Sequence, residues 1–231
     1  MQQPDIASGI IWYVVFVYST VCHEAAHAFA SYKLGDRTAY EGGQVSLDPT
    51  PHIRREPIGM VVMPIVSFFV NHWVMGWASA PYDPEWARRF PRRSAIMAMA
   101  GPVANLLLVL LASLLILAGA KAGVFHVPEK YWLDSLVVSS SGPAWEGCAK
   151  VLSILWSLNT LLFFFNLLPL PPLDGSAIPL FFLRGRSADS YQEMIAQPAM
   201  QLFGMVVALN GFWYVFHPLY GALASRLHDF M

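Results

Sequence analysis

The sequence predicts an all-α polytopic membrane protein, and three observations support this fold class. Hydrophobic residues make up 56% of the 231 residues and charged residues only 13%, against about 25% charged in ordinary soluble domains. Several apolar runs are long enough to cross a bilayer, which takes about 20 helical residues. Lys and Arg gather beside some of these runs. We expect a three-helix core, one or two further apolar segments and a small β-ribbon.

The three core helices are expected at residues 6–34, 94–120 and 149–168. The first run carries no charge between residues 6 and 22, and Gly35 supplies a helix stop. A further apolar run predicts a last helix at 200–216. We find no repeat and no separate soluble region in the sequence, so residues 1–231 are expected to form a single membrane-embedded domain.

The small ribbon is expected directly after the first helix. Residues 38–41 and 44–47 flank Gly42-Gly43, and a two-residue glycine turn between two short runs is typical of a β-hairpin. Asp48-Pro49 and Thr50-Pro51 indicate turns after it.

The apolar segment 58–77 either spans the membrane or enters it and returns. It contains Pro64 and Asn71, which make it a poorer spanning helix than the others. Basic residues lie on both sides of it, namely Lys33, Arg37, Arg54 and Arg55 before and Arg88, Arg89, Arg92 and Arg93 after. A spanning segment would place these groups on opposite faces, although Lys and Arg collect in cytoplasmic loops. We therefore favour a re-entrant or interfacial segment, with the first helix running inward.

The sequence His23-Glu24-Ala25-Ala26-His27 lies inside the first predicted membrane helix. Ionisable side chains in hydrocarbon are costly and mark functional sites. Positions i and i+4 share a helix face, so His23 and His27 can offer two imidazole nitrogens to one metal while Glu24 handles protons. This is the arrangement of a metallopeptidase.

A catalytic zinc usually takes three protein ligands and leaves a fourth position open. Asp174 is the acidic residue at the end of a later membrane helix, where prolines precede it and Gly175 permits a tight turn. The alternative is a simple turn residue in a Leu-Asp-Gly corner. Asn166 is a candidate donor to a developing oxyanion, and Asn105 follows Gly101 by four residues. Both amides are equally well explained as hydrogen bonds between helices.

These residues resemble the site-2 proteases, a family of intramembrane zinc metalloproteases, and in particular a compact bacterial branch of it. The resemblance is carried by the motif at 23–27, by Ala100-Gly101-Pro102-Val103-Ala104-Asn105 and by the stretch from Phe165-Asn166 to Leu173-Asp174-Gly175. It implies zinc as the cofactor. The implied roles are metal ligation by His23, His27 and Asp174, general base catalysis by Glu24, catalysis and substrate binding by Asn166, and substrate binding by Asn105.

We therefore expect a zinc metalloendopeptidase that cuts a peptide bond in or next to a transmembrane segment of a membrane protein, using zinc-bound water activated by Glu24. The expected location is a bacterial cytoplasmic membrane, with the active site towards the cytoplasm. The ribbon at 38–47 could hold the substrate by edge pairing. The net charge of −1 gives no reason to expect nucleic acid. Alternatives are a metal-binding transporter or sensor, or a scaffold for membrane helices, and the same ligands could hold iron.

Overall fold

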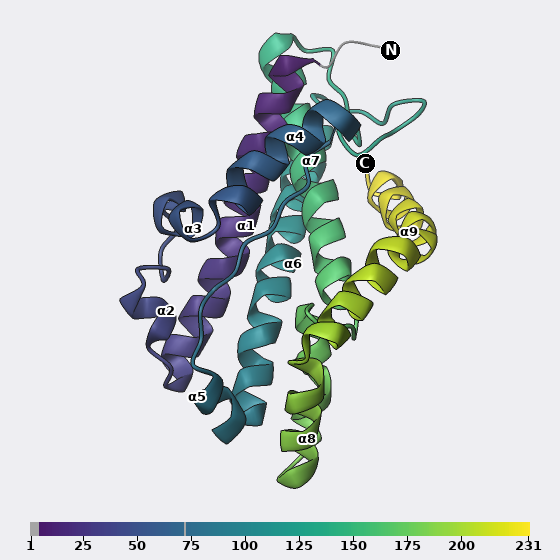
Figure 1. Cartoon of the computed structure of the whole chain (residues 1–231). Coiled ribbons are helices and arrows are strands. Elements are labelled where there is room, and N and C mark those ends of the chain that lie inside the picture. Colours follow the sequence, from purple (N-terminus) through teal and green to yellow (C-terminus); the bar gives the residue numbers. More distant parts are fainter. Residues whose placement is uncertain (1–4, 72) are drawn as a thin grey trace.

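The computed structural model describes residues 5–71 and 73–231, and four long helices dominate it (Figure 1). They are α1 (Ile6–Leu34), α6 (Pro91–Lys121), α7 (Pro143–Asn166) and α9 (Pro198–Asp229). Each is long and apolar enough to cross a bilayer. The all-α polytopic fold class is confirmed, and the chain is an integral membrane protein.

Helix α6 is the centre of the bundle, because both α1 and α7 pack along it and also contact each other. Its inward face carries small buried residues, among them Ala95, Ala98 and Gly101, which let neighbouring helices approach closely. Leu107 and Leu114 on its other face are exposed, as expected of side chains that face lipid. The three helices form the predicted core.

The ends of the helices follow local capping rules. Gly35 ends α1 in the left-handed conformation at φ 108°, with Gly35 N–H donating to Tyr32 O and Asp36 N–H to Ser31 O. Helix α7 begins at Pro143, earlier than the predicted residue 149. Helix α9 continues to Asp229 instead of ending at 216, with Pro218 inside it. Proline is tolerated within membrane helices.

The predicted β-ribbon was wrong, because residues 38–47 contain no strand. Thr38–Glu41 form the single turn α2, which starts where Asp36 accepts hydrogen bonds from the backbone N–H and hydroxyl of Thr38. Gly43, at φ 73°, ends this turn, with Gly43 N–H donating to Tyr40 O and Gln44 N–H to Ala39 O. The glycine pair therefore serves as a helix C-cap instead of a hairpin turn.

The Asp48-Pro49 pair begins a further short helix. Asp48 caps α3 (Pro49–Arg55), with its carboxylate accepting from Thr50 N–H and Pro49 in the first turn. Hydrogen bonds from the side chain and the backbone N–H of Thr50 hold the pKa of Asp48 below its ordinary value.

The segment after α3 is too short to cross the membrane as a helix. A π-helical turn (Ile58–Val62) runs into α4 (Met63–Asn71), and five plus nine residues reach only about 21 Å, against a hydrocarbon core of about 30 Å. The chain then returns in extended form to α5 (Pro84–Arg89), near the start of α6 (Figure 1). Trp77 N–H, in the returning segment, donates to Gly59 O in the π-helical turn. This path favours the re-entrant interpretation.

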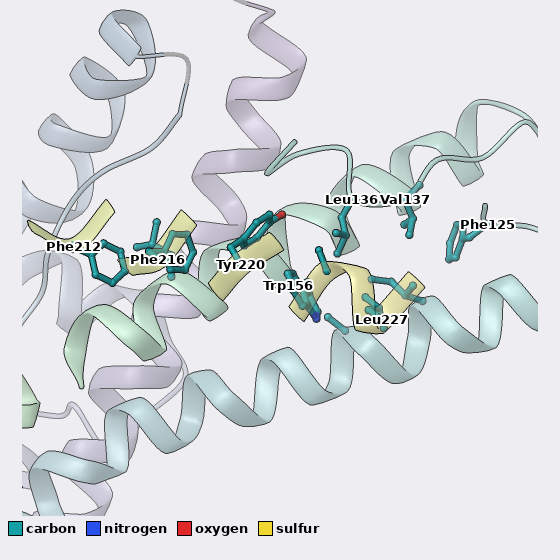
Figure 2. Packing of buried hydrophobic residues seen from close by; sticks show 13 residues of the cluster. Phe125, Leu136, Val137, Trp156, Phe212, Phe216, Tyr220 and Leu227 are labelled. Carbon is teal, nitrogen blue, oxygen red and sulfur yellow. The ribbon is translucent and has the colours of Figure 1, made fainter. Parts of the chain in front are cut away.

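The remaining elements close the bundle on two sides. A 3-10 helix, η2 (Asp174–Phe181), packs against α6 and is followed by α8 (Arg186–Ile195). Figure 2 shows the apolar cluster between α9 and α7, in which Phe212, Phe216 and Tyr220 of α9 follow one another and Tyr220 contacts Trp156 of α7. The Tyr220 hydroxyl and Ser157 Oγ lie 2.7 Å apart in a hydrogen bond. Helix α9 is thus fixed to α7.

Candidate metal centre

Three side chains from two elements meet within the helical bundle. His23 and His27 are both buried on α1, 6% and 8% exposed, and their Nε2 atoms are 3.0 Å apart. Asp174 begins η2, and its Oδ2 lies 3.1 Å from Nε2 of His23 and 3.4 Å from Nε2 of His27. The structure thus brings together the three residues that the sequence singled out as candidate ligands.

The second nitrogen of each imidazole faces a hydrogen-bond acceptor. His27 Nδ1 lies 2.8 Å from the Met97 carbonyl oxygen, which can only accept, so Nδ1 carries the proton and a neutral ring leaves Nε2 bare. His23 Nδ1 lies 2.6 Å from Asn105 Oδ1 and donates to it. In the neutral form with the proton on Nδ1, both rings turn a bare Nε2 towards Asp174. Such outer contacts are typical of histidines that bind metal.

This arrangement fits a divalent cation. Two ligands bound tetrahedrally at about 2.0–2.1 Å lie about 3.3 Å apart, close to the three separations of 3.0, 3.1 and 3.4 Å. Asp174 Oδ2 is buried, and the two Nε2 atoms lie closest to it among the polar contacts of the described residues. With each ring proton on Nδ1, three acceptor atoms face one another, and a bound cation would satisfy all three.

Gly101 of α6 leaves the space that such an ion needs. A β-carbon at this residue would lie 2.5 Å from Nε2 of His23 and 2.3 Å from Nε2 of His27. Gly101 therefore borders the converging ligand atoms.

Glu24 stands next to the two histidines without taking part in their hydrogen bonds. The candidate ligand atoms of His23, Glu24 and His27 all lie within 4.8 Å of one another. In residues 5–71 and 73–231, the carboxylate of Glu24 makes no hydrogen bond and no ion pair. It is therefore available to accept a proton.

The corner that carries Asp174 is held tightly. A β-carbon on Gly175 would lie 2.3 Å from the Leu167 carbonyl oxygen, so only glycine fits the turn. The Tyr191 hydroxyl of α8 donates to the Ser176 carbonyl at 2.7 Å. Burial raises the pKa of Tyr191, which keeps this hydroxyl protonated as a donor.

The two predicted asparagines occupy different places. Asn105 is fully buried behind His23. Asn166 is the last residue of α7, and its amide donates to Leu162 O at 3.0 Å; within the described part of the chain no hydrogen bond joins it to His23, Glu24, His27 or Asp174. An Asn amide has two N–H groups, and the structure gives only one of them a partner within the described residues.

Two contacts of this centre were not found from the sequence. Asn159 accepts from Asn105 at 2.8 Å, and it could have been found because it is an amide in the middle of an apolar span. The Met97 carbonyl carries no sequence signal, since every residue has one.

Comparison with known proteins identifies the family. The model of "Peptidase family M50" matches residues 11–209. "Putative zinc metalloprotease YwhC" of Bacillus subtilis is 32% identical over 71% of this chain and 65% of its own length. "Putative zinc metalloprotease Rip2" is 27% identical in Mycolicibacterium smegmatis, over 69% of this chain and 52% of the relative. Rip2 of Mycobacterium tuberculosis is 28% identical over 76% of this chain and 59% of its own length.

The chain thus spans about half to two thirds of the length of these curated relatives. No solved structure matches it. The family match covers most of the sequence and includes the histidine pair, Glu24 and Asp174. The chain therefore belongs to peptidase family M50, the family of the site-2 proteases.

Proposed function

We propose that this chain is an intramembrane zinc metalloendopeptidase that cuts a membrane protein in or next to a transmembrane segment. One observation carries the proposal: two imidazole nitrogens and one carboxylate oxygen converge at 3.0–3.4 Å beside a free carboxylate. The relatives named as zinc metalloproteases and the family match support the same reaction.

In this proposal His23, His27 and Asp174 hold the zinc. When bound, zinc makes water nucleophilic near neutral pH and polarises the peptide carbonyl. Glu24 takes the proton from the attacking water and passes it to the leaving nitrogen. Asn166 offers its remaining N–H to the developing oxyanion. The substrate helix unwinds locally first, because its backbone groups are otherwise satisfied within the helix.

The charge distribution supports a site near the cytoplasmic face of a bacterial membrane. Basic residues lie at the end of α1, on α5 and at the start of α6, which share one end of the bundle (Figure 1). His27 is seven residues from the end of α1, or about 10 Å along the helix. Since positive charge collects on the cytoplasmic side, water and substrate reach the centre from that face.

The test measures zinc content and cleavage of a transmembrane reporter in the same purified preparations. We expect wild type to hold one zinc and to cut. Glu24→Gln keeps the zinc and loses cleavage, because the base is lost and the ligands remain. Asp174→Ala loses both.

The matched control is Glu41→Gln, which removes an exposed carboxylate on α2, at the side of the bundle (Figure 1), and leaves both readouts unchanged. Normal cleavage by Glu24→Gln would contradict the assignment of Glu24 as the base. Bound zinc in a wild type that does not cleave the reporter would instead favour a metal transporter or sensor. Full zinc content in Asp174→Ala would instead remove Asp174 from the ligand set.

A further inference from the structure

Asn159 lies in the middle of α7, within an apolar span, and is completely buried. Its side chain makes three hydrogen bonds. Nδ2 donates to the Leu155 carbonyl at 2.8 Å and to Ser19 Oγ at 2.9 Å, and Oδ1 accepts from Asn105 Nδ2 at 2.8 Å. A fully satisfied amide in this place links α7 to α1 and α6.

The direction of this chain of hydrogen bonds is fixed at one end. The Leu155 carbonyl can only accept, so Asn159 must turn its NH2 group towards it and its oxygen towards Asn105. Asn105 then donates to Asn159, and its own oxygen points at Nδ1 of His23. An acceptor at Nδ1 places the ring proton there and leaves Nε2 bare.

This series of hydrogen bonds starts and ends on α1. Ser19 and His23 are separated by one turn of α1, and the path from Ser19 through Asn159 and Asn105 returns to His23. All of these side chains are buried, 6% exposed or less. Buried networks of this kind are rigid when every member is satisfied.

We propose that Asn159 is a positioning residue of the metal centre, acting through Asn105 to hold His23 in the tautomer and ring orientation that presents Nε2 to the metal. This inference rests on the proposed zinc site. It assigns Asn105 to orientation of His23 instead of the substrate binding that the resemblance implied, because Asn105 is fully buried and both ends of its amide are engaged.

A purely structural role would be that Asn159 only joins helices. Another buried residue of α7 allows the two roles to be compared. Ser157, two residues away, makes a buried hydrogen bond of 2.7 Å to Tyr220 of α9. That bond also joins two membrane helices, but it does not continue to His23. Ser157→Ala therefore reports what the loss of a buried interhelical hydrogen bond does by itself.

The experiment measures the Zn²⁺ affinity of full-length protein in detergent by competition with a chelator, together with the thermal stability of the metal-free protein. Without its acceptor at residue 159, Asn105 can turn and present NH2 to His23, which favours the proton on Nε2 and blocks ligation. We expect Asn159→Leu to bind Zn²⁺ about 10–100-fold more weakly, the range for lost outer contacts of metal ligands. Ser157→Ala lowers stability and leaves affinity unchanged.

A double variant separates a relay from two independent effects. If Asn159 acts through Asn105, then Asn105→Leu and Asn105→Leu/Asn159→Leu bind Zn²⁺ equally weakly, because the second change has nothing left to transmit. Should Asn159→Leu fail to fold, Asn159→Ala removes the same hydrogen bonds with a smaller side chain and serves in its place.

The outcomes distinguish this inference from the proposed function. A wild type that binds Zn²⁺ and an Asn159 variant of unchanged affinity would overturn the relay and leave the peptidase proposal intact. Additive losses in the double variant would also overturn it. A wild type that takes up no Zn²⁺ would overturn the zinc site, and the role of Asn159 with it.

Discussion

Gly101 of α6 lies so close to His27 of α1 that a β-carbon at residue 101 would stand 2.3 Å from the imidazole Nε2. An added methyl group would therefore occupy space between the ligand atoms or push α1 and α6 apart. We predict that Gly101→Ala loses bound zinc and cleavage together, measured as metal per protein and as product from a transmembrane reporter.

Gly211→Ala is the matched control for this change. Gly211 also lies inside a long membrane helix, but nothing lies within 4 Å of a β-carbon there. Alanine is favoured over glycine in a helix by about 0.5–1 kcal/mol, so this variant should be at least as stable as wild type and keep its zinc. One zinc per molecule in Gly101→Ala would show that the space beside His27 is not needed.

Helix α9 presses on the corner that leads to Asp174. A β-carbon on Gly204 would lie 2.0 Å from the Pro171 carbonyl oxygen, and a backbone atom there can yield only if the corner moves. We predict that Gly204→Ala destabilises the protein by about 1–3 kcal/mol, as overpacking does, and weakens zinc binding without abolishing it. Thermal unfolding and chelator competition measure the two effects. Equal zinc affinity in Gly204→Ala and Gly211→Ala would mean that α9 does not support Asp174.

The parts of this fold that could be predicted from sequence depend on local regularities. A bilayer sets the length of an apolar helix, so α1 and α6 were found with nearly correct bounds. Helical periodicity places His23 and His27 on one face whatever the surroundings. Asp174 could be predicted as a candidate ligand because a carboxylate beside prolines at the end of a membrane helix is rare.

The errors arose where one local pattern serves two structures. Gly42-Gly43 suits a hairpin turn and equally a helix C-cap. The hydrogen bonds from Thr38 to Asp36 favour the helical turn α2 at this point. The partners of the histidines needed the tertiary structure. Nothing in the sequence says that the Met97 carbonyl, or Asn159 through Asn105, would meet an imidazole.

The path of residues 58–77 predicts a topology that cysteine labelling can test. If this segment enters the membrane and returns, residues before and after it lie on the same side. In a background with Cys22 and Cys148 replaced by serine, we expect Arg54→Cys and Arg88→Cys to react with an impermeant maleimide from the cytoplasmic face. Lys130→Cys, in the loop between α6 and α7, should react only from the opposite face. Labelling of residues 54 and 88 from different faces would mean that the segment spans the membrane.

Asp36 lies where three helices meet, and we predict that its loss destabilises the protein. Its buried carboxylate accepts from the backbone N–H and hydroxyl of Thr38 and from Asp83 N–H at 3.0 Å. It thereby joins the end of α1 and the start of α2 to the cap of α5. Asp36→Ala leaves these donors without their partner, which costs about 1–3 kcal/mol for a buried group, so we expect a lower unfolding temperature in detergent with zinc content unchanged.

Asp48→Ala provides the comparison, because Asp48 also caps a helix through a hydrogen bond from Thr50 N–H but is exposed. It should lower the unfolding temperature less than Asp36→Ala does, since water replaces a lost bond at an exposed cap. An equal loss in both variants would mean that Asp36 contributes no more to stability than an exposed helix cap does. Loss of zinc from Asp36→Ala alone would instead mean that the end of α1 and the metal centre are coupled along the helix.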